Sequence, residues 1–216
     1  MRLYFSPLAC SMATRIALYE ADADASFVEV DAKTKRTLAG DDFTKKNPMG
    51  LVPTLETDDG QLLTENAAIL QWVAARFPKA ALAPTDDEGR TRLQEWLSFI
   101  GTELHKAIFA PLLDKAAPEG AKAYALGKVE PRFRRLEKHL TDRPFLLPTF
   151  SVADAYLVTV LTWTVATPID LKKWPALAAY VKGVRTLPSV AKAFGEEREL
   201  YAAEMARAGT HPIAGR

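Results

Sequence analysis

The first 77 residues combine short apolar runs with one amphipathic stretch, a pattern that predicts a small α/β unit. Leu3 to Phe5 is a brief apolar run that ends at Ser6-Pro7, which predicts a strand. Met12, Ile16 and Tyr19 then share one helical face, so a helix should follow. Residues 27 to 30 suggest a second strand. Residues 32 to 43 are mostly polar and predict at best an irregular helix.

A hairpin and a helix complete this unit. Residues 52 to 57 and 61 to 64 flank Asp58-Asp59-Gly60, a turn signal that predicts two antiparallel strands. The next helix takes its apolar stripe from residues 67 to 77 and should end at Pro78. The predicted order is therefore βαβαββα.

Beyond residue 85 the apolar spacing is helical throughout. Thr85 to Glu88 fits a capping box at the start of a long helix, whose apolar positions run from residue 93 to 109 before Pro111 bends or ends it. Further helices are expected after Pro118, after Ser151 in a second capping box, and at Trp174-Pro175. We therefore expect two domains, an α/β domain over residues 1–78 and an all-α domain over residues 86–216.

Composition narrows the possible partners and the cellular location. The chain has 28 Lys and Arg against 27 Asp and Glu, so no global basic field favours nucleic acid or an anionic membrane. No apolar stretch approaches the roughly 20 residues that span a bilayer. The single cysteine excludes a disulfide within the chain, and Met1-Arg2-Leu3 leads directly into the first strand. We expect a cytoplasmic protein without nucleic-acid or membrane partners.

Cys10, the single cysteine, stands between the first strand and the first helix. A lone cysteine is more often a small buried hydrophobe than a reagent. At a helix N-terminus, however, unpaired amide donors and the helix dipole favour the thiolate, which suits a site that handles thiols. Ser11, the next residue, is either a helix cap or a second chemical group.

The predicted order and several motifs fit one known arrangement. The order βαβαββα is that of a thioredoxin-like domain, and Val52-Pro53 lies where that fold carries a cis-proline. The other motifs are Ala9-Cys10-Ser11, the segment NPMGLVP at 47 to 53, Thr64-Glu65-Asn66, the segment WLSFIGTELHK at 96 to 106, and FSVADAYL at 150 to 157. As an ordered set they resemble a cytosolic glutathione transferase, specifically the bacterial beta class.

The resemblance implies glutathione as co-substrate and assigns residues to each of its parts. The main chain of Val52 would pair with the cysteinyl part, made possible by Pro53 in the cis form. Glu65 would meet the γ-glutamyl ammonium, and the amide and side chain of Asn66 its carboxylate. Glu65 at a helix start could instead only compensate the helix dipole.

The glycyl carboxylate would be held by Lys35, although Lys33 and Arg36 are close rivals and a solvated surface lysine is the alternative. On the long helix, Ser98, Thr102 and His105 recur at three- or four-residue steps and should share a face. His105 could hydrogen-bond a sulfur or assist proton removal, or be a structural histidine between the domains. Lys106 is a weaker neighbour.

The implied sites form two sets. The catalytic set is Cys10, His105 and Ser11. The glutathione-binding set is Ala9, Cys10, Lys35, Val52, Pro53, Glu65, Asn66, Ser98, Thr102, Glu103, Leu104 and His105, and no metal is implied.

Several positions depart from the beta-class pattern. Leu8 replaces a usual glycine, Leu51 a frequent glutamine, Asn66 a small residue, and Ser98 an asparagine. Leu51 and Ser98 each remove an amide side chain, so the site for glutathione should be weaker or differently shaped. The segment PFLLPTF at 144 to 150 also lacks an expected glycine turn. Tyr4 lies inside the first strand and should only pack there.

Three functions fit this sequence. The first is conjugation of glutathione to small hydrophobic electrophiles, in an apolar pocket beside Leu8, Phe109 and Leu112. The second is glutathione-dependent thiol-disulfide exchange through a mixed disulfide on Cys10. The third is a non-catalytic ligand-binding module. Redox chemistry with two protein thiols is excluded, because no resolving cysteine exists. The resemblance further implies a homodimer, and Trp96, Ile100 and Leu104 should bury the seam between the domains.

Overall fold

The computed structural model describes residues 1–209, and contacts divide the chain into two compact units. The first unit contains Met1–Leu82 and also the described residues from Pro188 onward, whereas the second contains Ala83–Leu187. The C-terminal helix thus packs with the N-terminal segment. The domain boundaries expected from the sequence, 1–78 and 86–216, stay a prediction.

The first unit is built on a mixed four-stranded sheet. Its strands are β1 (Arg2–Phe5), β2 (Ser26–Glu29), β3 (Thr54–Glu56) and β4 (Leu62–Leu63), in the order β2-β1-β3-β4. β1 is parallel to β2 and antiparallel to β3, so Leu3 lies between Phe27 and Leu55 in register. β3 and β4 form the predicted antiparallel hairpin.

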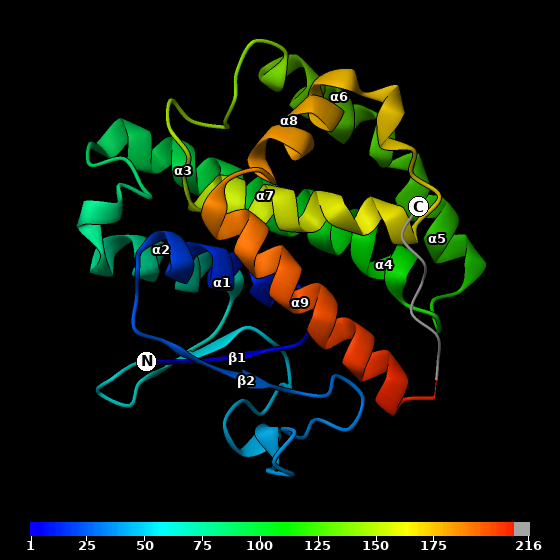
Figure 1. Ribbon diagram of the computed structural model, residues 1–216. Helices are drawn as coiled ribbons and strands as arrows, with labels where there is room; N and C mark the ends of the chain where they lie inside the picture. The colour runs from blue at the N-terminus through cyan, green and yellow to red at the C-terminus, as the bar shows by residue number, and fades with distance from the viewer. Residues whose placement is uncertain (210–216) are drawn as a thin grey trace. The chain divides into compact units, whose positions relative to one another are not determined.

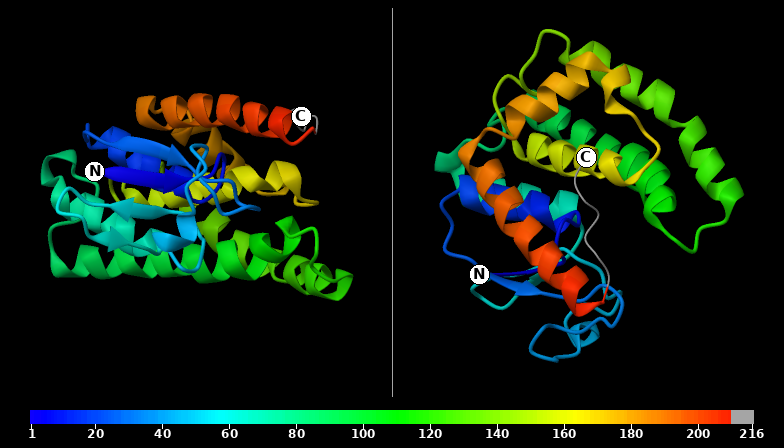
Figure 2. Two further views of the ribbon diagram at one scale, coloured as in Figure 1. Left: turned by 90° about the horizontal axis from the view of Figure 1, so that it is seen from below. Right: turned by 45° about the vertical axis from the view of Figure 1, so that its right-hand side comes forward.

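Three long helices belong to this unit. They are α1 (Ser11–Glu20), α2 (Asn66–Arg76) and α9 (Pro188–Arg207), with a short 3-10 turn, η2, over Pro78–Ala80. α1 connects the parallel strands β1 and β2 and packs against β1, α2 and α9, so every residue from Ser11 to Leu18 is buried. α1 and α9 lie side by side (Figure 1), and α9 runs along one side of the unit (Figure 2).

The irregular helix expected over residues 32 to 43 does not form. Asp31 accepts hydrogen bonds on its carboxylate from the main-chain N–H groups of Lys33 and Thr34, which closes a turn in place of a helix. Only a 3-10 helix follows, η1 (Phe43–Lys45), capped by Asp42. Phe43 anchors it in a small core with Tyr4 and Val30. The observed order is therefore βαβββα, with a 3-10 turn where the second helix was expected.

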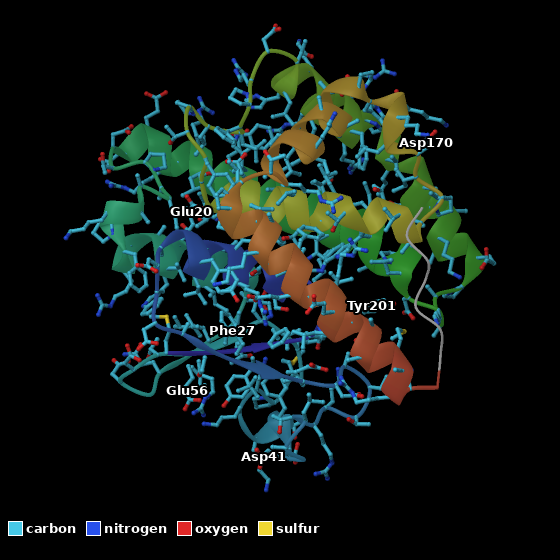
Figure 3. The ribbon with its side chains drawn as sticks, in the orientation of Figure 1. Glu20, Phe27, Asp41, Glu56, Asp170 and Tyr201 are labelled. Atoms are coloured by element: carbon cyan, nitrogen blue, oxygen red, sulfur yellow. The ribbon has the colours of Figure 1, made fainter. Side chains whose placement is uncertain are left out.

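Tyr4 packs inside the sheet, as the sequence predicted. Its side chain is 4% exposed, its ring contacts Phe43, and its hydroxyl donates to Glu56 Oε2 at 3.0 Å. Figure 3 marks Glu56 at the end of β3 and Phe27 on β2. The ring of Tyr4 thus packs in the core, and its hydroxyl binds a side chain of the neighbouring strand.

The second unit contains only helices among its described residues, as predicted. Its main helices are α3 (Asp87–Phe99), η3 (Ile100–Phe109), α4 (Ala110–Leu113), α5 (Glu119–Gly127), α6 (Val129–Leu140), α7 (Val152–Thr162) and α8 (Pro175–Val184), with short 3-10 turns η4 (Trp163–Ala166) and η5 (Leu171–Lys173). α7 is buried from Val152 to Leu161 and packs against α3, η3 and α8. It is the central helix of this unit.

The helix starts agree with the sequence at three of four places, and α5 begins directly after Pro118 as expected. Asp154 accepts the main-chain N–H of Ser151 at 3.0 Å, which confirms the second capping box. Pro175 opens α8 as expected. The first capping box was wrong by one residue, because Asp86 and not Thr85 caps α3, accepting from the N–H of Gly89 at 2.8 Å.

The long helix changes character at Ile100. The apolar spacing predicts an α-helix over residues 93 to 109, yet η3 is a π-helix, in which hydrogen bonds join residues five apart. At its end the N–H of Ala110 donates to the carbonyl of His105. Pro111 lies in the first turn of α4, and the helix ends at Leu113. No helix within residues 1–209 is long and apolar enough to cross a membrane.

Candidate functional site

The thiol of Cys10 lies at the start of α1, on a turn that links two segments of the first unit. Cys10 is the N-cap residue of α1 and is partly exposed. Its Sγ donates to the carbonyl oxygen of Val52 at 3.3 Å, so the turn contacts the loop before β3. Partial exposure distinguishes Cys10 from a simple buried hydrophobe.

Two local effects act on this sulfur in opposite directions. The positive dipole at the start of α1 favours the thiolate, although the N–H groups of Met12 and Ala13 already donate to the carbonyls of Ala9 and Cys10. The hydrogen bond to Val52 exists only while the sulfur carries its proton, so it favours the thiol. A group that takes over the Val52 carbonyl would therefore remove one interaction that favours the thiol.

Ser11 is a structural residue of the same turn. Its side chain is fully buried, and its Oγ lies 3.3 Å from both the main-chain N–H and the carbonyl oxygen of Ser6. Ser6 in turn donates its hydroxyl to the carbonyl of Val30 at 2.6 Å. Because its hydroxyl is engaged inside the protein, Ser11 is neither the helix cap nor an accessible chemical group.

Leu8 adopts a left-handed backbone conformation, and its N–H binds a carboxyl group that is distant in the sequence. Its φ is +57°, a region that favours glycine. Its N–H donates to Oε2 of Glu197 at 2.7 Å. Glu197 lies on α9 and is fully buried, and this burial raises its pKa to about 8, opposed by Arg15 and by the Leu8 amide.

The guanidinium of Arg15 lies beside the buried carboxyl group of Glu197. Its Nε is 3.1 Å from Oε1 of Glu197, and its guanidinium lies 4.2 Å from the ring centroids of both Phe5 and Phe27. Sequence reasoning missed Glu197, because 189 residues separate it from Leu8 and no local pattern marks it.

The loop before β3 is held by Asn47. Its Nδ2 donates to the carbonyl of Leu51 at 2.8 Å and to Oγ1 of Thr54 at 3.2 Å. The Val52-Pro53 peptide bond is cis, as predicted. Leu51 is 47% exposed, so the amide that a glutamine would offer there is replaced by an exposed apolar side chain.

The N-terminus of α2 carries two candidate residues with different environments. Glu65 is exposed and occupies the N-cap position with φ +66° and ψ +113°, a sparsely populated conformation for a residue with a side chain. Asn66 is buried. Its Nδ2 donates to the Cys10 carbonyl at 3.1 Å, and its Oδ1 accepts from Oγ1 of Thr14 at 2.9 Å.

The predicted role of the Asn66 side chain therefore needs correction. Its side-chain amide joins α1 to α2 and donates to the carbonyl of Cys10. It is therefore not available to bind the ligand carboxylate, which is the role that the sequence suggested. The N–H of Ala68 already donates to the carbonyl of Glu65 at 3.0 Å, so the N–H groups of Asn66 and Ala67 are the anion donors at the start of α2.

Lys35 is distinguished from its two rivals by its packing. Its φ is +57°, and its side chain crosses Gly50, where an added Cβ would come within 3.1 Å of Lys35 Cδ. Arg36 is engaged with the carbonyl of Gly40 at 2.7 Å, and Lys33 is exposed. Lys35 is thus the one of the three that packs on the loop leading to Val52.

In the second unit, His105 lies within an aromatic cluster. Its Nδ1 is 2.7 Å from the hydroxyl of Tyr156, and its ring centroid is 5.0 Å from that of Trp163. Burial, aided by the nearby charge of Lys106, lowers the pKa of His105 to about 4. The side chain is therefore neutral at pH 7, and it is a weak base.

The aromatic cluster extends behind His105. Phe109 is fully buried, with its ring 5.7 Å from Trp163 and 6.5 Å from Phe133. Leu112, by contrast, is partly exposed. Tyr156 and Trp163 were not singled out from the sequence, although Tyr156 belongs to the quoted segment FSVADAYL.

The remaining long-helix candidates do not share a face with His105. Ser98 and Thr102 are exposed, and Thr102 donates its hydroxyl to the carbonyl of Ser98 at 2.9 Å. The expected common face was wrong, because the π-helix widens the repeat to four or five residues. Glu103 accepts from Arg132 Nε at 2.9 Å, and Leu104 is fully buried.

Residues 1–209 contain no group of three or more His, Cys, Asp or Glu side chains placed to hold a metal ion. Taken separately, the first unit is a thioredoxin-like α/β unit with a thiol at the start of its first helix, and the second is an all-α unit. These features define the class of two-domain thioredoxin-like proteins.

Comparison with known proteins identifies the family within this class. The family model for the glutathione S-transferase N-terminal domain matches residues 1–75, and the model for the C-terminal domain matches residues 114–183. Glutathione S-transferase GstA of Escherichia coli O157:H7 is 39% identical over 199 residues, covering 91% of this chain and 98% of that protein.

Solved structures agree. A sphingomonad glutathione S-transferase complexed with glutathione is 43% identical with a TM-score of 0.87, covering 92% of this chain and 99% of that one. A bacterial beta-class glutathione S-transferase from Sphingomonas chungbukensis is also 43% identical, with a TM-score of 0.87 over 91% and 98% of the two chains. The chain belongs to the glutathione S-transferase family, and the predicted fold and beta class are confirmed.

Proposed function

We propose that this glutathione S-transferase conjugates the thiol of glutathione to small hydrophobic electrophiles. The observation that carries the proposal is the contact between Cys10 Sγ and the Val52 carbonyl, which places the thiol at the start of α1 beside the loop that precedes β3. A relative that is 43% identical is described as complexed with glutathione, which supports the choice of co-substrate.

Glutathione carries two carboxylates and one ammonium, and the first unit offers a partner for each. The exposed carboxylate of Glu65 would bind the ammonium, and the first-turn N–H groups of α2 the neighbouring carboxylate. Lys35, fixed over Gly50, would bind the glycyl carboxylate. The main chain of Val52 would pair with the cysteinyl part.

This binding mode would also remove the hydrogen bond from Cys10 to Val52. A peptide N–H of glutathione that pairs with the Val52 carbonyl replaces the hydrogen bond donated by Cys10. The amide groups at the start of α1 can then stabilise a thiolate beside them. In conjugation, the glutathione sulfur attacks the electrophile and the leaving group departs. Leu8, two residues before Cys10, would contribute an apolar side chain near the electrophile.

The second candidate is exchange with glutathione mixed disulfides, favoured by the partial exposure of Cys10 at a helix start. The Cys10 thiolate would attack the glutathione sulfur of the mixed disulfide and release the substrate thiolate. A second glutathione thiolate would then attack the Cys10 adduct, which yields glutathione disulfide and restores Cys10. This cycle needs no second protein thiol.

Replacing Cys10 separates the two activities. Cys10→Ala should abolish turnover of a glutathione mixed disulfide, because the nucleophile is lost, and should retain conjugation of a chromogenic electrophile within about ten-fold. Cys10→Ser serves as the control of similar size. Undiminished disulfide turnover in both variants would exclude the role of Cys10. Wild-type protein that binds glutathione in calorimetry without turnover would favour a binding module, and failure to bind it would contradict the proposal itself.

We further propose that the protein acts in the cytoplasm and as a homodimer. Support comes from the family to which the chain belongs and from a nearly neutral composition with a single cysteine.

A further inference from the structure

The hydroxyl of Tyr156 in α7 forms a side-chain hydrogen bond with Nδ1 of His105 in η3. The two atoms are 2.7 Å apart, a short distance for a neutral pair. Tyr156 is 3% exposed and His105 is mostly buried, so water does not compete freely for the bond. From this contact we propose that Tyr156 is a positioning residue that makes His105 a hydrogen-bond donor through Nε2.

The packing around Tyr156 fixes where its hydroxyl lies. The tyrosine ring approaches the π-helix at Gly101, where an added Cβ would sit 3.8 Å from the hydroxyl oxygen. Its ring meets the imidazole edge-on, with an interplanar angle of 89°. Trp163 contacts the imidazole as well, at 65°. The plane of the histidine ring is therefore held by two aromatic contacts and one hydrogen bond.

The chemistry of the pair determines the position of the proton. A neutral imidazole has one donor nitrogen and one acceptor nitrogen, and a phenol is a good donor. When Tyr156 donates to Nδ1, the proton of the ring must reside on Nε2. Protonation of Nδ1 would reverse the bond, so that the imidazole donates to the tyrosine oxygen.

The second ring nitrogen of His105, Nε2, is available to bind a substrate. Among residues 1–209, Nε2 of His105 has no hydrogen-bond partner, and it is not a fully buried atom. In the Nε2–H form this nitrogen donates a hydrogen bond and cannot accept a proton. The sequence left two roles open for His105, stabilising a sulfur or removing its proton. The geometry favours the first, with a sulfur anion as the class of group recognised. This inference rests on the proposed function.

Nitrogen NMR tests the proton position without any activity. In ¹⁵N-labelled protein at pH 7, the ring of His105, assigned by comparison with His105→Gln, should show a protonated Nε2 and an unprotonated Nδ1. A dominant Nδ1–H form would overturn the proposal, because His105 would then donate to Tyr156 and present an acceptor.

Tyr156→Phe removes only the hydroxyl and keeps the ring, so folding can be verified by its unfolding transition. We expect the Nδ1 resonance to move toward that of a free acceptor and kcat for conjugation to fall about three- to ten-fold, with little change in KM for glutathione. Tyr124→Phe, which removes the same atom at a 70% exposed position on α5, should change neither.

Two outcomes separate this inference from the proposed function. An active wild type whose Tyr156→Phe variant keeps both its Nδ1 resonance and its kcat would overturn the inference and leave the function standing. The second outcome is an inactive wild type that shows the Nε2–H form of His105, together with a Tyr156→Phe variant that no longer shows this single form. It would contradict the proposed function and support the positioning of His105 by Tyr156.

Discussion

Burial makes His105 a neutral side chain in the folded protein, and this has a consequence for stability. The pKa of a histidine in the unfolded chain is near 6.5, whereas that of folded His105 is lowered to about 4. Between these values the unfolded chain binds a proton that the folded protein does not. The stability linked to His105 is therefore fully present above pH 6.5 and is lost as the pH falls toward 4.

We predict a measurable difference between wild type and His105→Gln in this window. The free energy of unfolding of the wild type should fall more steeply from pH 6.5 to 4.5, by up to about 1.4 kcal/mol per pH unit. Urea titrations at several pH values measure both curves. Curves that stay parallel over the whole range would contradict the low pKa of His105.

At the scale of a single helix, α9 carries two adjacent glutamates with different surroundings. Glu197 is fully buried against Arg15 and the Leu8 amide, whereas Glu196 is 40% exposed and contacts Arg15 NH1 at 3.1 Å. A buried charge that loses its partner is costly, while an exposed pair is worth little.

Glu197→Ala should lower the free energy of unfolding by about 2 kcal/mol, because the Leu8 amide loses its acceptor. The raised pKa of Glu197 means that little negative charge is lost beside Arg15 at pH 7. Glu196→Ala is the matched control and should cost about 1 kcal/mol or less. Chemical denaturation of both variants at pH 7 decides the point. Equal losses would mean that burial does not distinguish the two carboxylates.

Much of this arrangement was predictable from local patterns. The strands, the hairpin turn and the capping box at Ser151 follow from spacing and turn chemistry, and Cys10 was correctly placed at a helix start. The segment after Asp31 was not predictable in this way, because one carboxylate bonds to two nearby N–H groups and replaces the expected helix.

Two further features depend on packing and not on sequence pattern. Ile100, Leu104 and Ile108 are spaced by four, which fits an α-helix and a π-helix equally well, so only the tertiary contacts select the wider form. The contact between Glu197 and Leu8 joins the two ends of the chain and has no local signature. The role of the Asn66 side chain was misjudged for the same reason.

At the scale of the whole molecule, the proposed homodimer gives a direct test. Sedimentation equilibrium at micromolar concentration should yield twice the chain mass of 23.8 kDa. The expected dimer follows from family membership, and the net charge of +1 offers little electrostatic repulsion between copies. A monomeric mass across this concentration range would contradict it, and would leave the chemistry of Cys10 and His105 to be judged separately.

Because α9 belongs to the first unit, the two units cannot finish folding on the ribosome in the order in which their synthesis begins. Domains generally fold as units while the chain emerges. Ala83–Leu187 is one continuous stretch and can close as soon as it has left the exit tunnel. The first unit must wait for α9 to be made, since until then Arg15 has no carboxyl group from α9 beside it. The unit that is synthesised first is thus the one that finishes folding last.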